Sequence, residues 1–128
     1  MKRITILFAA AALVLTVFVP AVVASGGGTR IVLKAAKAFP AAKGSATVKA
    51  KPGERELQVE VEHIRRLAGK RVAFFVASKK LATAKVNAFG EARVERNSER
   101  GQLVPAVSAG TRVRVRTAAG ALIVKGSF

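Results

Sequence analysis

The sequence contains no cysteine, aspartate, tyrosine or tryptophan, and it has a single histidine, His63. Without cysteine the chain cannot form a disulfide or carry a lipid on a thiol, so packing alone must hold the fold. Zinc sites combine cysteine, histidine and carboxylate ligands, and calcium-binding loops take most of their ligands from aspartate. We therefore expect no metal site and no cofactor.

The same shortage argues against an enzyme, because acid–base and nucleophilic catalysis need groups that move protons or attack. His63 directly follows Glu62, and neighbours on a strand point to opposite faces. We interpret His63 as a residue at the rim or edge of the core, on the face of Leu57, Val59 and Val61. We expect no catalytic residues and no small-molecule substrate, and an enzyme is the least favoured of three functional hypotheses.

Residues 1–24 have the pattern of a secretory signal peptide. Two basic residues precede the apolar run 4–19, and Pro20 and the sequence AVVAS follow it. Val22 and Ala24 supply the small side chains that a signal peptidase requires, which predicts cleavage after Ala24 and a secreted or periplasmic protein. The alternative is an uncleaved membrane anchor, because about 20 apolar residues suffice to cross a bilayer.

Positive charge dominates the sequence. The 23 lysines and arginines outnumber 7 acids, all of them glutamates, giving a net charge of +16; without the two cations of the leader the balance is 21 to 7, or +14. Such a charge keeps a protein soluble and attracts polyanions. The expected partner is an anionic polymer or surface, such as a wall polymer, lipopolysaccharide or lipid headgroups.

Sequence-specific binding of nucleic acid is not expected. Recognition of single strands uses exposed aromatic rings on which bases stack. Phe74 and Phe75 lie in the most apolar run of the chain, which predicts that both are buried. Contacts with released nucleic acid should then involve only the phosphate backbone and should weaken strongly with salt.

Apolar and polar residues alternate at a period of two through much of the chain, which is typical of β-strands. Residues 45–51 and 55–63 flank the turn sequence KPGE and form the clearest hairpin. A slip of one residue would exchange its two faces, so polar and apolar pairing together define one register. The predicted partners are Lys51–Glu54, Lys49–Glu56 and Thr47–Gln58 on one face, and Val48–Leu57 and Ala46–Val59 on the other.

The remaining segments predict further short strands. The run 71–78 is apolar on both faces, which is typical of a central strand covered on both sides. Lys79 and Lys80 are predicted to form a turn, and Pro105 makes residues 103–110 an edge segment or an irregular crossing. We divide the chain into a signal peptide (1–24), a flexible lead-in (25–29) and a single domain (30–128). The domain is expected to be all-β, a small antiparallel β-sandwich or β-barrel of about seven or eight strands.

The C-terminal half carries a family resemblance. The stretches VNAFGEARVE, GQLVPAVSAGTRVRV and GALIVKGSF share a skeleton of strands, glycine turns and a closing Gly-x-Phe. In these stretches the chain resembles small secreted bacterial all-β domains of uncharacterised role. The resemblance implies a β-sandwich or barrel and export from the cell. Its motifs are turns and core positions, so it supplies no functional residues.

The run TRVRVRT offers the first candidate site. Val113 and Val115 should face the core, which leaves Arg112, Arg114 and Arg116 in a row at a spacing of roughly 6.5–7 Å. Guanidinium groups at this spacing can meet successive phosphates or sulfates. The plainer interpretation is a solvated face, partly neutralised by glutamates of residues 91–97 if that strand is its neighbour. A second basic group is predicted in connecting loops: Arg65, Arg66, Lys70, Arg71, Lys79 and Lys80.

These features favour an exported, non-catalytic module with a structural or adhesive role at the cell envelope and an electrostatic affinity for anionic polymers or surfaces. The alternative is a cationic protein that acts on membranes or inhibits a target. Membrane activity usually requires an amphipathic segment with large exposed apolar residues, and residues 25–128 show no clear example.

Overall fold

The computed structural model describes residues 28–128, so the predicted signal peptide and residues 25–27 of the lead-in lie outside the described part. The described chain is all-β, and its only helical segments are two 3-10 turns, η2 (Arg65–Leu67) and η3 (Ser98–Arg100). None of its helices is long and apolar enough to cross a membrane. The strands are β1 (Gly28–Ala35), β2 (Lys43–Lys51), β3 (Glu54–Glu62), β4 (Arg71–Val76), β5 (Lys79–Lys85), β6 (Ala92–Asn97), β7 (Arg112–Thr117) and β8 (Leu122–Ser127).

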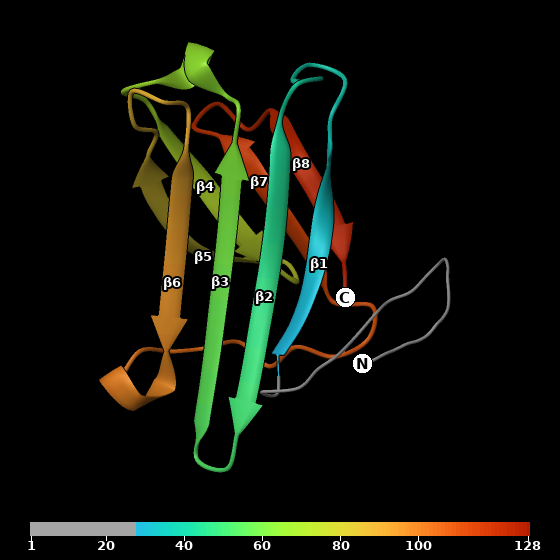
Figure 1. Cartoon of the computed structure of the whole chain (residues 1–128), viewed down its shortest axis with the longest axis vertical. Coiled ribbons are helices and arrows are strands. Elements are labelled where there is room, and N and C mark those ends of the chain that lie inside the picture. Colours follow the sequence, from blue (N-terminus) through green and yellow to red (C-terminus); the bar gives the residue numbers. More distant parts are fainter. Residues whose placement is uncertain (1–27) are drawn as a thin grey trace, which may run out of the picture.

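The eight strands form one antiparallel sheet in the order β5-β4-β7-β8-β1-β2-β3-β6. The sheet curls until β6, β3, β2 and β1 form a front layer over β5, β4, β7 and β8 behind (Figure 1). The two edge strands approach without a backbone ladder, and the Arg96 guanidinium of β6 donates to the Leu81 carbonyl of β5 at 3.4 Å. The predicted all-β class is confirmed, in the form of a nearly closed barrel.

The hairpin of β2 and β3 has the predicted register. Lys49 lies opposite Glu56, Thr47 opposite Gln58 and Val48 opposite Leu57. The turn between the strands contains Gly53 at φ 79°, a conformation that glycine adopts at little steric cost. Local turn chemistry and the alternation of side chains therefore agree, and together they exclude a one-residue slip.

The barrel interior is filled by inward-facing side chains of both layers. Leu57, Val59 and Val61 of the front layer and Phe74 and Val115 of the rear layer are fully buried. Loops close the two ends. The loops at one end contain the buried residues Phe39, Ile64 and Val86, and the crossing 101–111, in which Val104 is buried, runs past the other end (Figure 1). The crossing contains no strand. Of the two alternatives predicted for residues 103–110, the structure therefore has the irregular crossing and not the edge segment.

Three local predictions need correction. The turn between β4 and β5 is Ala77–Ser78, so Lys79 and Lys80 belong to β5 and not to a turn. Ala77 adopts φ 58°, a conformation that no glycine or asparagine signals at this position. β4 is central, but only its inner face is covered, because Phe75 on its outer face is partly exposed. Gly28 and Thr29 of the predicted lead-in pair with β2 as the start of β1.

Candidate anion-binding face

The three arginines of β7 point outward, as the alternation predicts. Val113 and Val115 between them are fully buried. Arg112 is exposed, and Arg114 and Arg116 are partly exposed. The strand lies between β4 and β8 in the rear layer, where the sheet fixes its orientation on both sides.

The strand of residues 91–97, which the sequence suggested as a neighbour of β7, does not pair with it. β6, with Glu95 and the preceding Glu91, pairs only with β3. After β6 the chain passes through η3 and crosses the end of the barrel before β7 begins, which places the two strands in opposite layers (Figure 1). The glutamates of this segment therefore do not neutralise the arginines of β7.

Charge is divided unequally between the two layers. The four rear strands contain eight cations and no glutamate: Arg71, Lys79, Lys80, Lys85, Arg112, Arg114, Arg116 and Lys125. All seven glutamates lie on β3, on β6 or beside β6: Glu54, Glu56, Glu60, Glu62, Glu91, Glu95 and Glu99. The charged residues of the rear strands are thus all cations, and we call these eight residues the basic face. Lys79 is exposed at the end of the barrel, because it lies directly opposite the buried Val76, and the other seven are on the outer surface.

The second predicted basic group is divided by the fold. Arg71, Lys79 and Lys80 join the basic face, whereas Arg65, Arg66 and Lys70 lie in the connection that covers one end of the barrel. The Arg66 guanidinium lies 4.3 Å from the centroid of the Phe39 ring and donates to the Ala38 carbonyl.

The backbone of Arg65 packs closely against the loop that contains Gly90. A side chain on Gly90 would come within 2.6 Å of the Arg65 backbone nitrogen, so these two loops are in close contact. The Arg65 backbone and the Arg66 side chain are therefore part of the loop packing at this end, apart from the basic face. Lys70 is exposed just before β4, with its backbone N–H bonded to the Leu67 carbonyl.

Strand pairing adds two lysines, Lys34 and Lys125, that the sequence pattern did not single out. Lys125 of β8 lies directly opposite Arg114, and Lys34 of β1 lies directly opposite Lys125. On the other side of β7, Phe75 is opposite Arg114 and Lys80 is opposite Phe75. Only the order and register of strands distant in sequence bring these residues together, so no local pattern could have revealed them.

Phe75 also lines a shallow depression of about 300 Å³ on the basic face. Ala73 and Thr83 line it together with Phe75, and two cations, Arg71 and Arg116, also belong to its lining. The prediction that Phe74 and Phe75 are both buried is thus right for Phe74 and wrong for Phe75. The basic face therefore includes one partly exposed aromatic ring.

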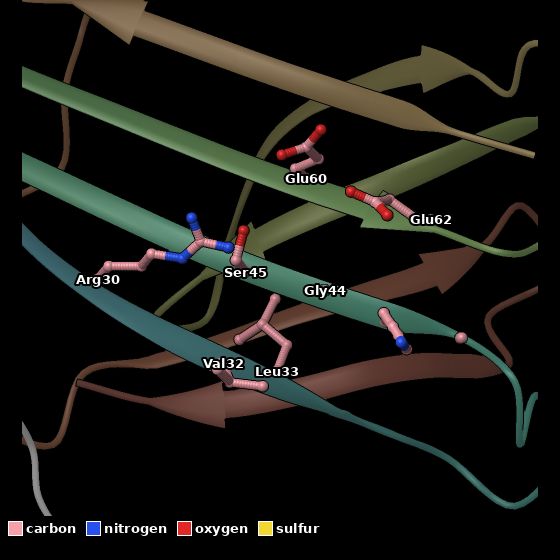
Figure 2. A pocket seen from close by; sticks show the side chains of 9 residues that line it. Arg30, Val32, Leu33, Gly44, Ser45, Glu60 and Glu62 are labelled. Atoms are coloured by element: carbon pink, nitrogen blue, oxygen red, sulfur yellow. The ribbon is translucent and has the colours of Figure 1, made fainter.

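A second depression, of about 350 Å³, lies on the outer side of the front layer. Figure 2 shows Arg30, Val32 and Ser45 on one side of it and Glu60 and Glu62 on the other. Its lining also contains Lys43, so two cations and two carboxylates balance one another there. Unlike the basic face, this depression has no excess of positive charge to attract a polyanion.

His63 is at the rim, but it does not share the face of Val61. Its backbone has φ 64°, which ends β3 and turns the side chain outward, where it is 57% exposed. Its imidazole Nε2 lies 3.8 Å from the Glu62 carboxylate, the only contact within 4.0 Å between a basic and an acidic side chain among residues 28–128.

Comparisons of the chain with protein-family models, with curated proteins and with solved structures find no match. The likeness of the C-terminal half to secreted β-domains therefore stays a resemblance.

Proposed function

We propose that this protein is an exported, non-catalytic β-barrel module that binds anionic polymers or surfaces at the cell envelope. The proposal is supported above all by the separation of charge, with eight cations and no acid on the four rear strands. A face of one sign attracts a polyanion at long range and holds it by many contacts. Arg112, Arg114 and Arg116 provide planar donor groups suited to phosphate, sulfate or carboxylate.

The membrane-active alternative receives less support. Three large apolar side chains are strongly exposed, Val32 (75%), Phe89 (69%) and Leu103 (83%). They belong to β1 and to two separate loops, and none is on the four rear strands. A cationic segment that inserts into lipid needs its apolar and basic residues on adjoining faces of one element.

Salt elution from a heparin column tests the proposal. Replacing Lys79, Lys85 and Lys125 by Gln removes three charges from the basic face. Replacing Lys43, Lys49 and Lys51 on β2 by Gln removes three charges from the front layer and is the matched control. We expect the wild-type chain to bind at physiological salt and the rear variant to elute at clearly lower salt than the control.

Passage of the wild-type chain without retention at physiological salt would overturn the proposal. Equal shifts for the two variants would show that total charge, and not the basic face, determines binding. Dye release from anionic vesicles by the wild-type chain would support the membrane-active alternative. Expression in a bacterium followed by N-terminal sequencing tests export, and the expected mature chain begins at Ser25.

A further inference from the structure

The register of the four rear strands and of the adjoining end of β1 aligns one residue from each of five adjacent strands. Lys34 (β1), Lys125 (β8), Arg114 (β7), Phe75 (β4) and Lys80 (β5) are successive direct partners. Direct partners in a sheet share a face, so the five side chains project from the same outer surface. We call these five residues the transverse row.

The transverse row has the spacing of a linear binding track. Neighbouring strands are about 4.8 Å apart, so the row extends over roughly 19 Å from β1 to β5. Lys34, Lys125 and Lys80 are exposed, and Arg114 and Phe75 are partly exposed. No glutamate lies on β8, β7, β4 or β5, which leaves the track free of repulsion for an anion.

Phe75 distinguishes the transverse row from a simple basic surface. Its ring is on the outer face between Arg114 and Lys80, and it borders the depression that Ala73 and Thr83 line. Proteins that bind single-stranded nucleic acid without sequence preference combine a cationic track with aromatic rings on which bases stack. A double helix keeps its bases inside and could offer this convex face only its phosphates.

We infer that the transverse row binds single-stranded nucleic acid, which runs across the strands. The phosphates contact Lys34, Lys125, Arg114 and Lys80, and one base stacks on Phe75. The inference rests on the proposed function, because it names the class of polyanion that the basic face accepts. Binding is expected to be independent of sequence, since stacking on one ring suits every base.

Phe75→Leu tests stacking, because leucine keeps an apolar side chain and removes the ring. Fluorescence anisotropy with labelled oligothymidylate should show a loss of affinity of roughly five- to hundredfold. Binding of inorganic polyphosphate, which has no rings, should not change. Phe89→Leu is the matched control, because Phe89 is 69% exposed outside the rear strands, and it should leave both affinities unchanged.

A second pair of variants tests the track. Replacing Lys34, Lys80 and Lys125 by Gln should weaken oligothymidylate binding and lower the salt slope by up to about 2, at roughly 0.7 per phosphate contact. Replacing Lys43, Lys49 and Lys51 by Gln removes the same charge from β2 and should change the slope little. Phe75→Tyr should keep most of the affinity, which separates loss of the ring from damage to the fold.

The outcomes separate the two proposals. If Phe75→Leu binds oligothymidylate as the wild-type chain does, the inference is wrong, whereas retained binding of polyphosphate and heparin leaves the proposed function intact. Equal effects of the two triple variants would also overturn the inference that the transverse row is the binding site. Failure of the wild-type chain to bind any of these polyanions at physiological salt would overturn both proposals.

Discussion

Gly90 and Gly53 have almost the same backbone conformation in very different surroundings. Their φ angles are 82° and 79°. An added Cβ at Gly90 would meet the Arg65 backbone at 2.6 Å, whereas none of the atoms around Gly53 lies within 4 Å of such a Cβ. Gly53→Ala should therefore cost only the left-handed strain, about 1–2 kcal/mol.

Gly90→Ala adds a clash with backbone to the same strain, and we expect it to lower the free energy of unfolding by more than about 3 kcal/mol or to prevent folding. Urea unfolding followed by circular dichroism measures both variants. Similar midpoints for the two would show that the loops of Gly90 and Arg65 are not in close contact.

Ala77 presents the opposite case, an L-residue where glycine is favoured. Its φ of 58° costs about 1–2 kcal/mol relative to glycine, and glycine loses about 0.5–1 kcal/mol through its greater freedom in the unfolded chain. Ala77→Gly should thus stabilise the protein by up to about 1.5 kcal/mol. Ser78→Gly in the same two-residue turn is the control and should destabilise it, because Ser78 has no positive φ. Thermal unfolding of the two variants checks the sign.

At the scale of elements, the β2–β3 register can be tested covalently, because the chain has no native cysteine. Thr47 and Gln58 are direct partners, so their Cα atoms are within the range of a disulfide. Thr47→Cys with Gln58→Cys should oxidise readily and raise the free energy of unfolding by about 2–3 kcal/mol. Thr47→Cys with Glu56→Cys places the thiols diagonally and should stay mostly reduced. Thiol titration that reports the reverse preference would show a slipped register.

This hairpin was predictable because its information is local. The turn residues and the alternation of 45–51 and 55–63 specify the same pairing without reference to the rest of the chain. The pairing of β4 with β7 and of β1 with β8 depends instead on two crossings of the barrel ends. No short-range pattern encodes such crossings, so β6 was a reasonable but wrong neighbour for β7.

The candidate site, like the strand pairing, was predictable only where the information is local. The outward direction of Arg112, Arg114 and Arg116 followed from two intervening valines, and the structure confirms that both valines are buried. Phe75 could not be assigned in this way, because Phe74 and Phe75 give an apolar residue to each face of β4. Which face is outer depends on the curvature of the whole sheet, and only the assembled barrel resolves it.

For the whole molecule, the separation of charge gives stability and polyanion binding opposite responses to salt. Cations on the rear strands repel one another, and the repulsion is strongest at low ionic strength, where the Debye length is about 30 Å at 0.01 M. Raising salt to about 0.2 M should raise the melting temperature of the free protein. Over the same range polyanion affinity should fall, because releasing counterions into a more concentrated salt solution is less favourable.

Two double variants assign the repulsion to the rear layer. Lys85 is directly opposite Arg71, and Lys125 lies between Arg114 and Lys34. Replacing Lys85 and Lys125 by Glu turns repulsive pairs into attractive ones and should raise the melting temperature at low salt.

Lys49 and Lys51 on β2 are the matched control, because they are directly opposite Glu56 and Glu54. Replacing both by Glu changes the net charge by the same amount but creates like-charge pairs, so the melting temperature should fall. Both shifts should shrink as salt rises, since screening acts on attraction and repulsion alike. If the two variants shift the melting temperature in the same direction, net charge alone governs stability. The charges of the basic face would then affect the melting temperature no differently from charges on the front layer.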